Sequence, residues 1–440
     1  MALEETLYSS LYSLFYKILL DPIESAKILM EILVLILILQ FRVRDQSGVL
    51  KLPEHLITKL INEFEPEPLV DPLPPTVLIE RIYNFTLLDL CNYDAFDLRN
   101  KFKLELKATV QKYGVGTCGP PTFFGTLDIH KELEQGIATH LNTESALLYS
   151  NYYACIQSVI SCFCNGEDHV FYNASANEGI LRGLYHSKAK SFEFTTVESL
   201  KILLEVNFKP KVRNYVILEG LSKNSGQICP LPSILSLKQT FPFRIILDES
   251  CAIPLLHPKG ICGFYGINIK KIEMIVGSFS NGLSSCGGFF AGDENICEYQ
   301  KISSSSYVFS ASLPAVFAKF NLLALKEDFN YKNLRKNIKT FVTHFSSNHF
   351  EILSSLESPL IIITYKNEFN QNLKESDLLR RVYVIKHHLK TNGIYIGINK
   401  SPKPGVGKLF GSRAGKLKKF LSRAGWSKKN RAAGRMVHGP

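Results

Sequence analysis

The sequence VGSFSNGLSSCGGFF, residues 276–290, decides the fold. An apolar run at 274–276 leads into a turn of small residues and then into a Gly-Gly-aromatic step. This pattern predicts a buried strand that presents a short side chain to a cleft, while the glycines let another backbone approach. The side chain so presented is Asn281, whose amide is neither a nucleophile nor a base near neutral pH. We therefore expect a cleft whose central side chain performs no covalent chemistry.

The same stretch resembles the cofactor-lysine segment of the α-oxoamine synthases, pyridoxal-phosphate enzymes that join an amino acid to an acyl thioester. In that family a lysine stands where Asn281 stands here. An amide cannot form the Schiff base that a lysine amine forms. Lys270 and Lys271 precede the predicted strand, so we do not expect them to substitute. The resemblance implies an α/β fold, the pyridoxal-phosphate-dependent transferase fold of type I, without its covalent anchor.

Composition and charge narrow the class of protein. At 440 residues with 45% hydrophobic content, the chain can bury a large core, and its length favours two or more lobes. Residues 400–440 contain twelve Lys and Arg and no Asp or Glu, so the formal net charge of +11 belongs to this tail. We expect no nucleic-acid partner, because aromatic residues are sparse in the tail. The ten cysteines have no metal-ligand spacing, so we expect reduced, mostly buried thiols and no metal site.

The N-terminal region is apolar. Residues 1–20 predict an amphipathic or interfacial helix, and the run ILMEILVLILIL at 28–39 is denser but short of the ~20 residues that a spanning helix needs. This run is either a membrane anchor or a helix packed on the globular body. As an anchor, its flanking Arg42 and Arg44 would place the next domain in the cytosol. The stretch EFEPEPLVDPLPP at 63–75 then predicts an extended linker.

The most specific stretch is YGVGTCGPPTFFGTLDIHKELE, residues 113–134. Its glycines and prolines predict an ordered non-helical loop, followed by a helix with Asp128 in its first turn. The stretch resembles a loop of the non-catalytic long-chain-base subunits of serine palmitoyltransferases, although Pro121-Thr122 replaces the usual Arg-Gly. The resemblance implies that Cys118, Gly119 and Phe123 lie at a subunit interface. The alternative for Cys118 is a buried structural thiol.

Further positions that handle the cofactor ring or phosphate in α-oxoamine synthases are altered here. The resemblance places Tyr152 at the phosphate-binding glycine, where its bulk would crowd the phosphate. Asn177 stands at the histidine that covers the ring, and Cys251 at the histidine that contacts the ring hydroxyl. Asp248, the partner of the pyridinium nitrogen, is kept, although a strand-end aspartate is as often a capping residue. The loss of these cofactor-binding residues in several separate segments indicates a chain that does not perform catalysis itself.

Later segments complete the predicted architecture. Runs at 215–220 and 244–248 predict buried parallel strands that end in acids. By resemblance, Ser310 and Ser312 contact the cofactor phosphate of a neighbouring subunit; the alternative is an ordinary N-cap before a helix over 315–326. A strand at 359–365 and a helix over 375–391 predict a smaller C-terminal α+β lobe. From Lys400 the resemblance ends, and we expect a disordered tail.

The sequence therefore predicts five segments: a membrane-associated helix over 1–44, a Pro/Glu-rich linker over 45–75, a large transferase-like domain over 76–325 with a mostly parallel sheet flanked by helices, a small domain over 326–399, and a basic tail over 400–440. The resemblance implies a regulatory subunit at the endoplasmic reticulum membrane, facing the cytosol. A lysine-bearing partner of the same fold would hold pyridoxal phosphate and condense L-serine with palmitoyl-CoA to 3-ketosphinganine. The alternatives are an active homodimeric acyltransferase and a membrane scaffold without an enzymatic partner.

Overall fold

The computed structural model describes residues 26–27, 30–37, 53–63, 88–90, 94–96, 98, 100–365, 375–392 and 394–397. The chain separates into two units, Met1–Asn84 and Phe85–Pro440. The predicted helix over 1–20, the proline-rich part of the predicted linker and the basic tail lie outside the described residues. The domain boundaries predicted at 76 and 326 stay predictions.

The first unit contains two described helical segments. Residues 30–37 are helical, and their apolar side chains are exposed. Helix α3, Glu54–Asn62, lies inside the segment predicted as a linker, before its proline-rich part. Among the described residues, no helix has both the length and the apolar character needed to cross a membrane. The membrane anchor over 28–39 stays a prediction.

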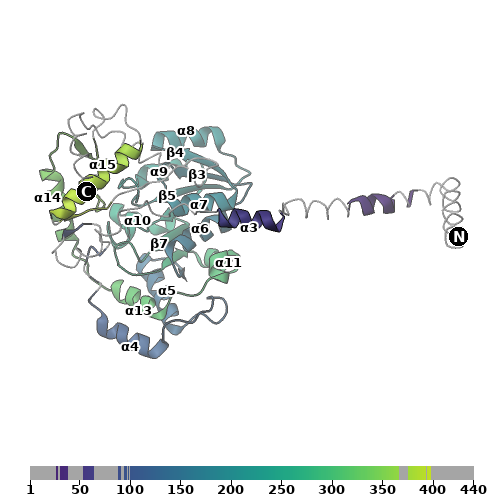
Figure 1. Ribbon diagram of the computed structural model, residues 1–440, viewed down its shortest axis with the longest axis horizontal. Helices are drawn as coiled ribbons and strands as arrows, with labels where there is room; N and C mark the ends of the chain where they lie inside the picture. Colours follow the sequence, from purple (N-terminus) through teal and green to yellow (C-terminus); the bar gives the residue numbers. More distant parts are fainter. Residues whose placement is uncertain are drawn as a thin grey trace. The chain divides into compact units, whose positions relative to one another are not determined.

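A seven-stranded sheet forms the centre of the second unit (Figure 1). Its order is β2-β8-β7-β6-β5-β3-β4, and all neighbours are parallel except β8, which is antiparallel to both β7 and β2. The predicted mostly parallel sheet is thereby confirmed. The reversal of β8 was not predicted; it follows from the short turn after β7, because a parallel return needs a longer crossover. The strands are β2 (Ser145–Tyr149), β3 (His169–Asn173), β4 (Lys190–Phe194), β5 (Asn214–Glu219), β6 (Arg244–Asp248), β7 (Met274–Ser278) and β8 (Gly288–Gly292).

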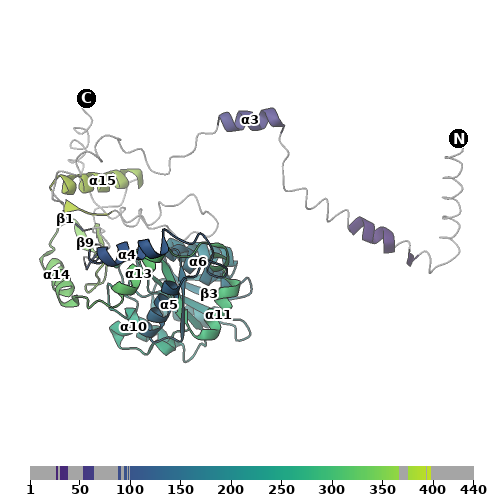
Figure 2. The ribbon, with the colours of Figure 1, turned by 90° about the horizontal axis from the view of Figure 1, so that it is seen from below.

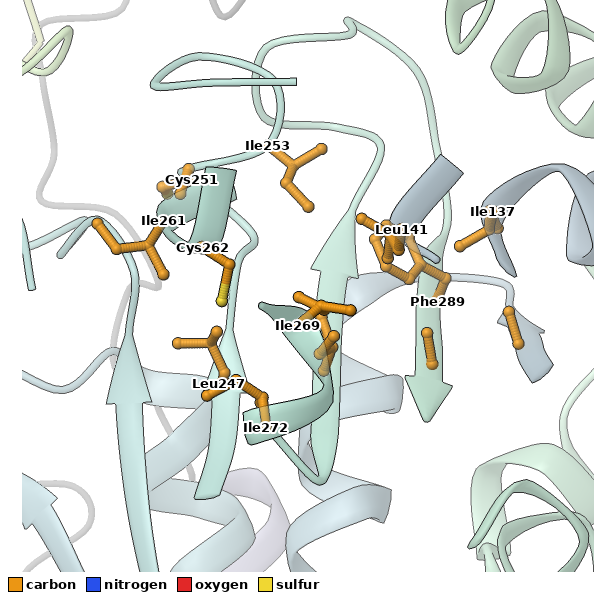
Figure 3. Packing of buried hydrophobic residues seen from close by; sticks show 14 of the residues in the cluster. Ile137, Leu141, Leu247, Cys251, Ile253, Ile261, Cys262, Ile269, Ile272 and Phe289 are labelled. Atoms are coloured by element: carbon orange, nitrogen blue, oxygen red, sulfur yellow. The ribbon is translucent and has the colours of Figure 1, made fainter. Parts of the chain in front are cut away.

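Helices cover both faces of this sheet, which explains why its central strands are continuous apolar runs. On β5, Val216 and Leu218 belong to one hydrophobic cluster, whereas Tyr215 and Ile217 belong to the other. Helices α5 (Asp128–Leu141) and α13 (Ala315–Ala324) contribute to the first cluster, and α6 (Tyr152–Phe163) and α7 (Glu178–Ser187) to the second. Figure 3 shows part of the first cluster, with Leu247 of β6 near Ile272 and Cys262.

Helix α4 lies beside α13 (Figure 2). The helix predicted after the glycine-rich loop, with Asp128 in its first turn, is confirmed as α5, and the helix predicted over 315–326 as α13. The other helices are α4 (Lys103–Tyr113), α8 (Val197–Asn207), α9 (Leu231–Leu237), α10 (Gly260–Tyr265), α11 (Glu294–Ser303), α12 (Ser305–Phe309), α14 (Tyr331–His344) and α15 (Glu375–Thr391), with a short 3-10 turn η1 (Ile269–Lys271).

Two further pairs of short strands lie outside the main sheet. β9 (Phe350–Ile352) pairs antiparallel with β10 (Ile363–Tyr365), and β1 (Leu88–Asp89) pairs in parallel with β11 (Ile394–Tyr395). The helix predicted over 375–391 is confirmed as α15. The strand predicted over 359–365 is shorter than expected. Pro359 has no N–H for a strand ladder, and the N–H groups of Leu360 and Ile362 donate to the hydroxyls of Ser358 and Ser354 instead.

Candidate functional site

The predicted site residues lie together at the carboxyl ends of three neighbouring strands, β5, β6 and β7. We call this end of the sheet the strand edge. Glu219 ends β5 and Asp248 ends β6, and the two residues are register partners. Asp248 also pairs with Val276 of β7, and Asn281 follows the end of β7 by three residues. In open α/β sheets ligands bind at this edge. The predicted placement of acids at strand ends is confirmed.

Glycines bring the start of α6 against this edge. A Cβ atom on Gly288 would lie 2.8 Å from the Cα of Tyr152 and 3.1 Å from the carbonyl oxygen of Asn151. A Cβ atom on Gly277 would collide with the ring of Phe289. The close backbone approach predicted from the Gly-Gly-aromatic step is therefore confirmed, and the approaching backbone is the first turn of α6.

Asp248 is held by three groups of this chain. The Tyr152 hydroxyl donates to its Oδ2 at 2.5 Å, and the Asn177 Nδ2 donates to the same oxygen at 2.8 Å. The Ser250 backbone N–H donates to its Oδ1 at 2.9 Å, so the carboxylate caps the turn after β6. Asp248, Tyr152 and Asn177 are all buried. Both carboxylate oxygens therefore already accept hydrogen bonds.

Asn177 connects this carboxylate to α7. Its Oδ1 accepts from the backbone N–H groups of Gly179 at 2.9 Å and Ile180 at 3.2 Å, which makes Asn177 the N-cap of the helix. Its Nδ2 also donates to Glu219 Oε1 at 3.0 Å and to the Tyr152 hydroxyl at 2.8 Å. The amide at the family's histidine position thus fixes a helix end and bridges two strand-end acids.

Burial sets the ionisation of this cluster. It raises the pKa of Asp248, and hydrogen bonds from Tyr152 and Ser250 oppose that rise. Burial and the neighbouring acids Asp248 and Glu219 raise the pKa of Tyr152 well above its usual value. The phenol therefore keeps its proton and acts as the donor to Asp248. Burial also raises the pKa of Glu249, the next residue, to about 8.

Asn281 and Cys251, the two altered positions on the far side of the edge, contact each other. Asn281 is buried, and its Nδ2 lies 3.5 Å from the Cys251 sulfur. Burial raises the pKa of the Cys251 thiol to about 12, so the thiol is neutral and a weak nucleophile. Neither side chain supplies an amine or a base.

The glycine-rich loop before α5 is partly exposed. Cys118 is exposed and has a φ of 54°, so the buried structural role considered for this thiol is wrong. The Gly119 carbonyl accepts from the Ser312 N–H at 2.9 Å, and Phe123 is exposed. Six of the nine described cysteines are buried, as expected for the majority. The interface roles of Cys118, Gly119 and Phe123 stay predictions.

The segment that contains Ser310 and Ser312 packs against this loop. The N-cap of α13 is Pro314, so the N-cap role considered for the two serines is wrong. The Ser312 hydroxyl is a buried oxygen that has no hydrogen-bond partner among the described residues. His130 fastens the segment to α5: its Nδ1 accepts from the Leu127 N–H at 3.0 Å, and its Nε2 lies 2.6 Å from the Leu313 carbonyl. The contact of Ser310 and Ser312 with a phosphate stays a prediction.

Sequence reasoning missed that the Tyr152 hydroxyl binds Asp248. The sequence resemblance predicts only that this side chain obstructs a phosphate. Part of this contact could be anticipated from the residue types. A tyrosine at the start of a helix that packs on the Gly-Gly step is long enough to reach the ends of the neighbouring strands. Glu249, whose carboxylate accepts from the Ile261 N–H at the start of α10, was not singled out either.

Comparison with known proteins agrees with this geometry. The model of the aminotransferase class I and II family matches residues 86–401. Long chain base biosynthesis protein 1b of Oryza sativa subsp. japonica is 32% identical over 380 residues, 79% of this chain and 78% of that protein. Serine palmitoyltransferase 1 of Saccharomyces cerevisiae is 30% identical over 349 residues, 70% of this chain and 62% of that protein. A solved serine palmitoyltransferase from S. paucimobilis, with a bound PLP–myriocin aldimine, has a TM-score of 0.65 at 20% identity and covers 78% of this chain and 90% of that chain.

The sheet order and the strand-end site define the pyridoxal-phosphate-dependent transferase class, as the resemblance implied. This chain belongs to the aminotransferase class I and II family, in the group whose members are named serine palmitoyltransferase 1 and long chain base biosynthesis protein 1. Both the predicted fold and the predicted family are confirmed.

Pyridoxal phosphate is the cofactor of this class, but the strand edge of this chain does not fit its ring. Asp248 would have to accept from the pyridinium nitrogen, yet its two oxygens already accept from Tyr152, Asn177 and Ser250. The amide of Asn281 offers no amine for covalent attachment. The cofactor contact predicted for Asp248 stays a prediction, and the observed contacts argue against it within this chain.

Proposed function

We propose that this chain is a non-catalytic regulatory subunit of serine palmitoyltransferase, the enzyme that condenses L-serine with palmitoyl-CoA to 3-ketosphinganine in sphingolipid biosynthesis. The observation that carries the proposal is the amide of Asn281 at the position of the Schiff-base lysine. In this proposal a homologous lysine-bearing subunit holds pyridoxal phosphate and performs the chemistry. This chain stabilises that subunit and completes its active site.

An exposed aromatic surface supports such a partner. It consists of Val115, Phe123 and Phe124 on the glycine-rich loop, together with Phe309, which precedes the segment that the Ser312–Gly119 hydrogen bond holds against this loop. These residues are 86%, 66%, 94% and 80% exposed, respectively. Large apolar side chains exposed in this number are typical of protein–protein interfaces. Cys118 belongs to the same loop, which supports the interface role predicted for it.

The position of Ser310 and Ser312 supports a contribution to the partner's site. The Ser312 N–H bond to the Gly119 carbonyl holds this segment against the glycine-rich loop, and Phe309 directly precedes it. Ser310 is half-buried, and the buried Ser312 hydroxyl has no hydrogen-bond partner among the described residues. In the proposed heterodimer they donate hydrogen bonds to the phosphate of the partner's cofactor.

We also propose that the first unit attaches the pair to the endoplasmic reticulum membrane, with the second unit in the cytosol. The support is the helical stretch at 30–37, where seven of eight side chains are large, apolar and exposed. Such a surface is stable when lipid or another apolar partner covers it.

Co-expression with a lysine-bearing homologue tests the proposal. The chain alone should be colourless and inactive, whereas the pair should show the visible absorbance of bound pyridoxal phosphate and turn over serine. Phe124→Asp should reduce co-purification of the partner, because it places a charge in the aromatic surface. Val206→Asp is the matched control, because Val206 on α8 is also an exposed apolar residue (76% exposed) but does not belong to the aromatic surface.

Two results would replace this proposal with its alternatives. Serine turnover by the chain alone would indicate an active homodimer. A chain that co-purifies with no lysine-bearing homologue would indicate a membrane scaffold.

A further inference from the structure

We infer that Tyr152 is a built-in substitute for the cofactor ring: its phenol fills the ring position at this chain's strand edge and donates to Asp248 in place of a pyridinium nitrogen. The inference concerns the chain's own edge and does not depend on the identity of a partner subunit. It goes beyond the absence of a lysine, because it assigns a positive role to a side chain that replaces a glycine.

The backbone places the phenol at the required position. Tyr152 is the first residue of α6, and the lack of a side chain on Gly288 lets its Cα approach β8. Its ring is buried and packs edge-to-face on Tyr153, with ring centroids 5.2 Å apart. A glycine at position 152 would leave the space of this ring open toward Asp248.

The hydrogen bonds reproduce those that a ring ligand would make. The phenol donates to Asp248 Oδ2 at 2.5 Å and accepts from Asn177 Nδ2 at 2.8 Å. Asn177 stands where the family's ring-covering histidine stands, so both of the chain's remaining ring-facing groups bind the same hydroxyl. A pyridinium and a phenol differ in charge, but each presents one donor hydrogen to the aspartate.

The consequence is a strand edge that is complete without a cofactor. Tyr152 and Asn177 tie α6 and α7 to the ends of β5 and β6. The same contacts exclude free ring ligands from this chain, so only one site of a subunit pair remains open to them.

Cavity rescue tests this role. Tyr152→Gly restores the residue that the family resemblance places here and removes a group with the shape of 4-methylphenol. Since a ligand that binds only the folded state raises its stability, 4-methylphenol should raise the thermal unfolding midpoint of this variant in a saturable way. Toluene has the same shape without the hydroxyl, so its effect should be smaller. Tyr153→Gly, which removes a partly exposed neighbouring phenol, is the control and should not respond.

Two outcomes would overturn the inference. One is a Tyr152→Gly variant that 4-methylphenol stabilises no more than it stabilises Tyr153→Gly. The other is an equal response to toluene and 4-methylphenol, because the hydroxyl would then make no contribution.

A second pair of variants covers the case in which Tyr152→Gly does not fold. Tyr152→Phe keeps the ring and removes only the hydroxyl, which leaves Asp248 and Asn177 without their shared partner. Its unfolding midpoint should fall clearly below that of the parent, whereas Tyr153→Phe should leave the midpoint unchanged. Equal midpoints for Tyr152→Phe and the parent would contradict the inference.

Discussion

Replacing Gly288 by alanine tests whether the close approach of β8 and α6 holds the strand edge together. The new Cβ would lie 2.8 Å from the Tyr152 Cα, 3.1 Å from the Asn151 carbonyl oxygen and 3.1 Å from the Tyr152 nitrogen. These are backbone atoms, so relief requires the first turn of α6 to move. Gly288 does not have a left-handed φ, so the contact alone determines the cost.

The magnitude follows from these contacts. Overpacking a buried site by a methyl group costs about 1–3 kcal/mol. Movement of Tyr152 also lengthens its hydrogen bond to Asp248, and the loss of a hydrogen bond to a charged group adds about 1.5–3 kcal/mol. We therefore expect Gly288→Ala to lower the free energy of unfolding by about 2.5–6 kcal/mol.

Urea unfolding provides the measurement. The urea concentration at the unfolding midpoint should be lower for Gly288→Ala than for the parent, while the slope of the unfolding free energy against urea concentration stays the same. Gly116→Ala is the control, because a Cβ atom on Gly116 would meet nothing within 4 Å. A midpoint for Gly288→Ala equal to that of the control would refute the reasoning.

Two further predictions concern buried charge. Arg213→Ala removes two hydrogen bonds of 2.9 Å to the buried carboxylate of Asp168, so we expect a loss of about 2–3 kcal/mol. Arg182→Ala, which removes an exposed ion pair with Glu178, should lower the free energy of unfolding by less than about 1 kcal/mol. Equal losses for Arg213→Ala and Arg182→Ala in urea unfolding would contradict this prediction. Burial raises the pKa of Glu249 from 4.5 to about 8, so its contribution to stability is complete below pH 4.5 and is lost as the pH rises through 8. Glu249→Gln should therefore gain stability relative to the parent between pH 5 and pH 8, by about 3–4 kcal/mol; a difference that does not change with pH would oppose this.

The sheet could be predicted largely from composition along the chain. Residues 215–218 and 245–247 are apolar runs without alternation, which is typical of parallel strands covered on both faces. The direction of β8 could not be predicted in the same way, because its sequence GFFAG is also an apolar run without alternation, yet the strand is antiparallel to both neighbours. That direction depends on how the turn between β7 and β8 closes.

The altered positions of the site could also be found from the sequence, but their mutual contacts could not. Tyr152 and Asp248 are 96 positions apart, and only the packing of α6 on the sheet edge brings them together. The exposure of Cys118 likewise depends on what covers the loop, not on its neighbours in sequence. For Ser310 and Ser312, the N-cap considered as the alternative is wrong although the helix begins at Ala315 as predicted, because Pro314 occupies the N-cap position.

The central claim is that this chain leaves the cofactor chemistry to a partner. The most direct test is the amount of pyridoxal phosphate bound per purified pair of this chain with a lysine-bearing homologue. The account predicts one bound cofactor for each pair of chains, and none released from this chain after the two are separated. Two cofactors for each pair, or cofactor retained by this chain alone, would contradict it.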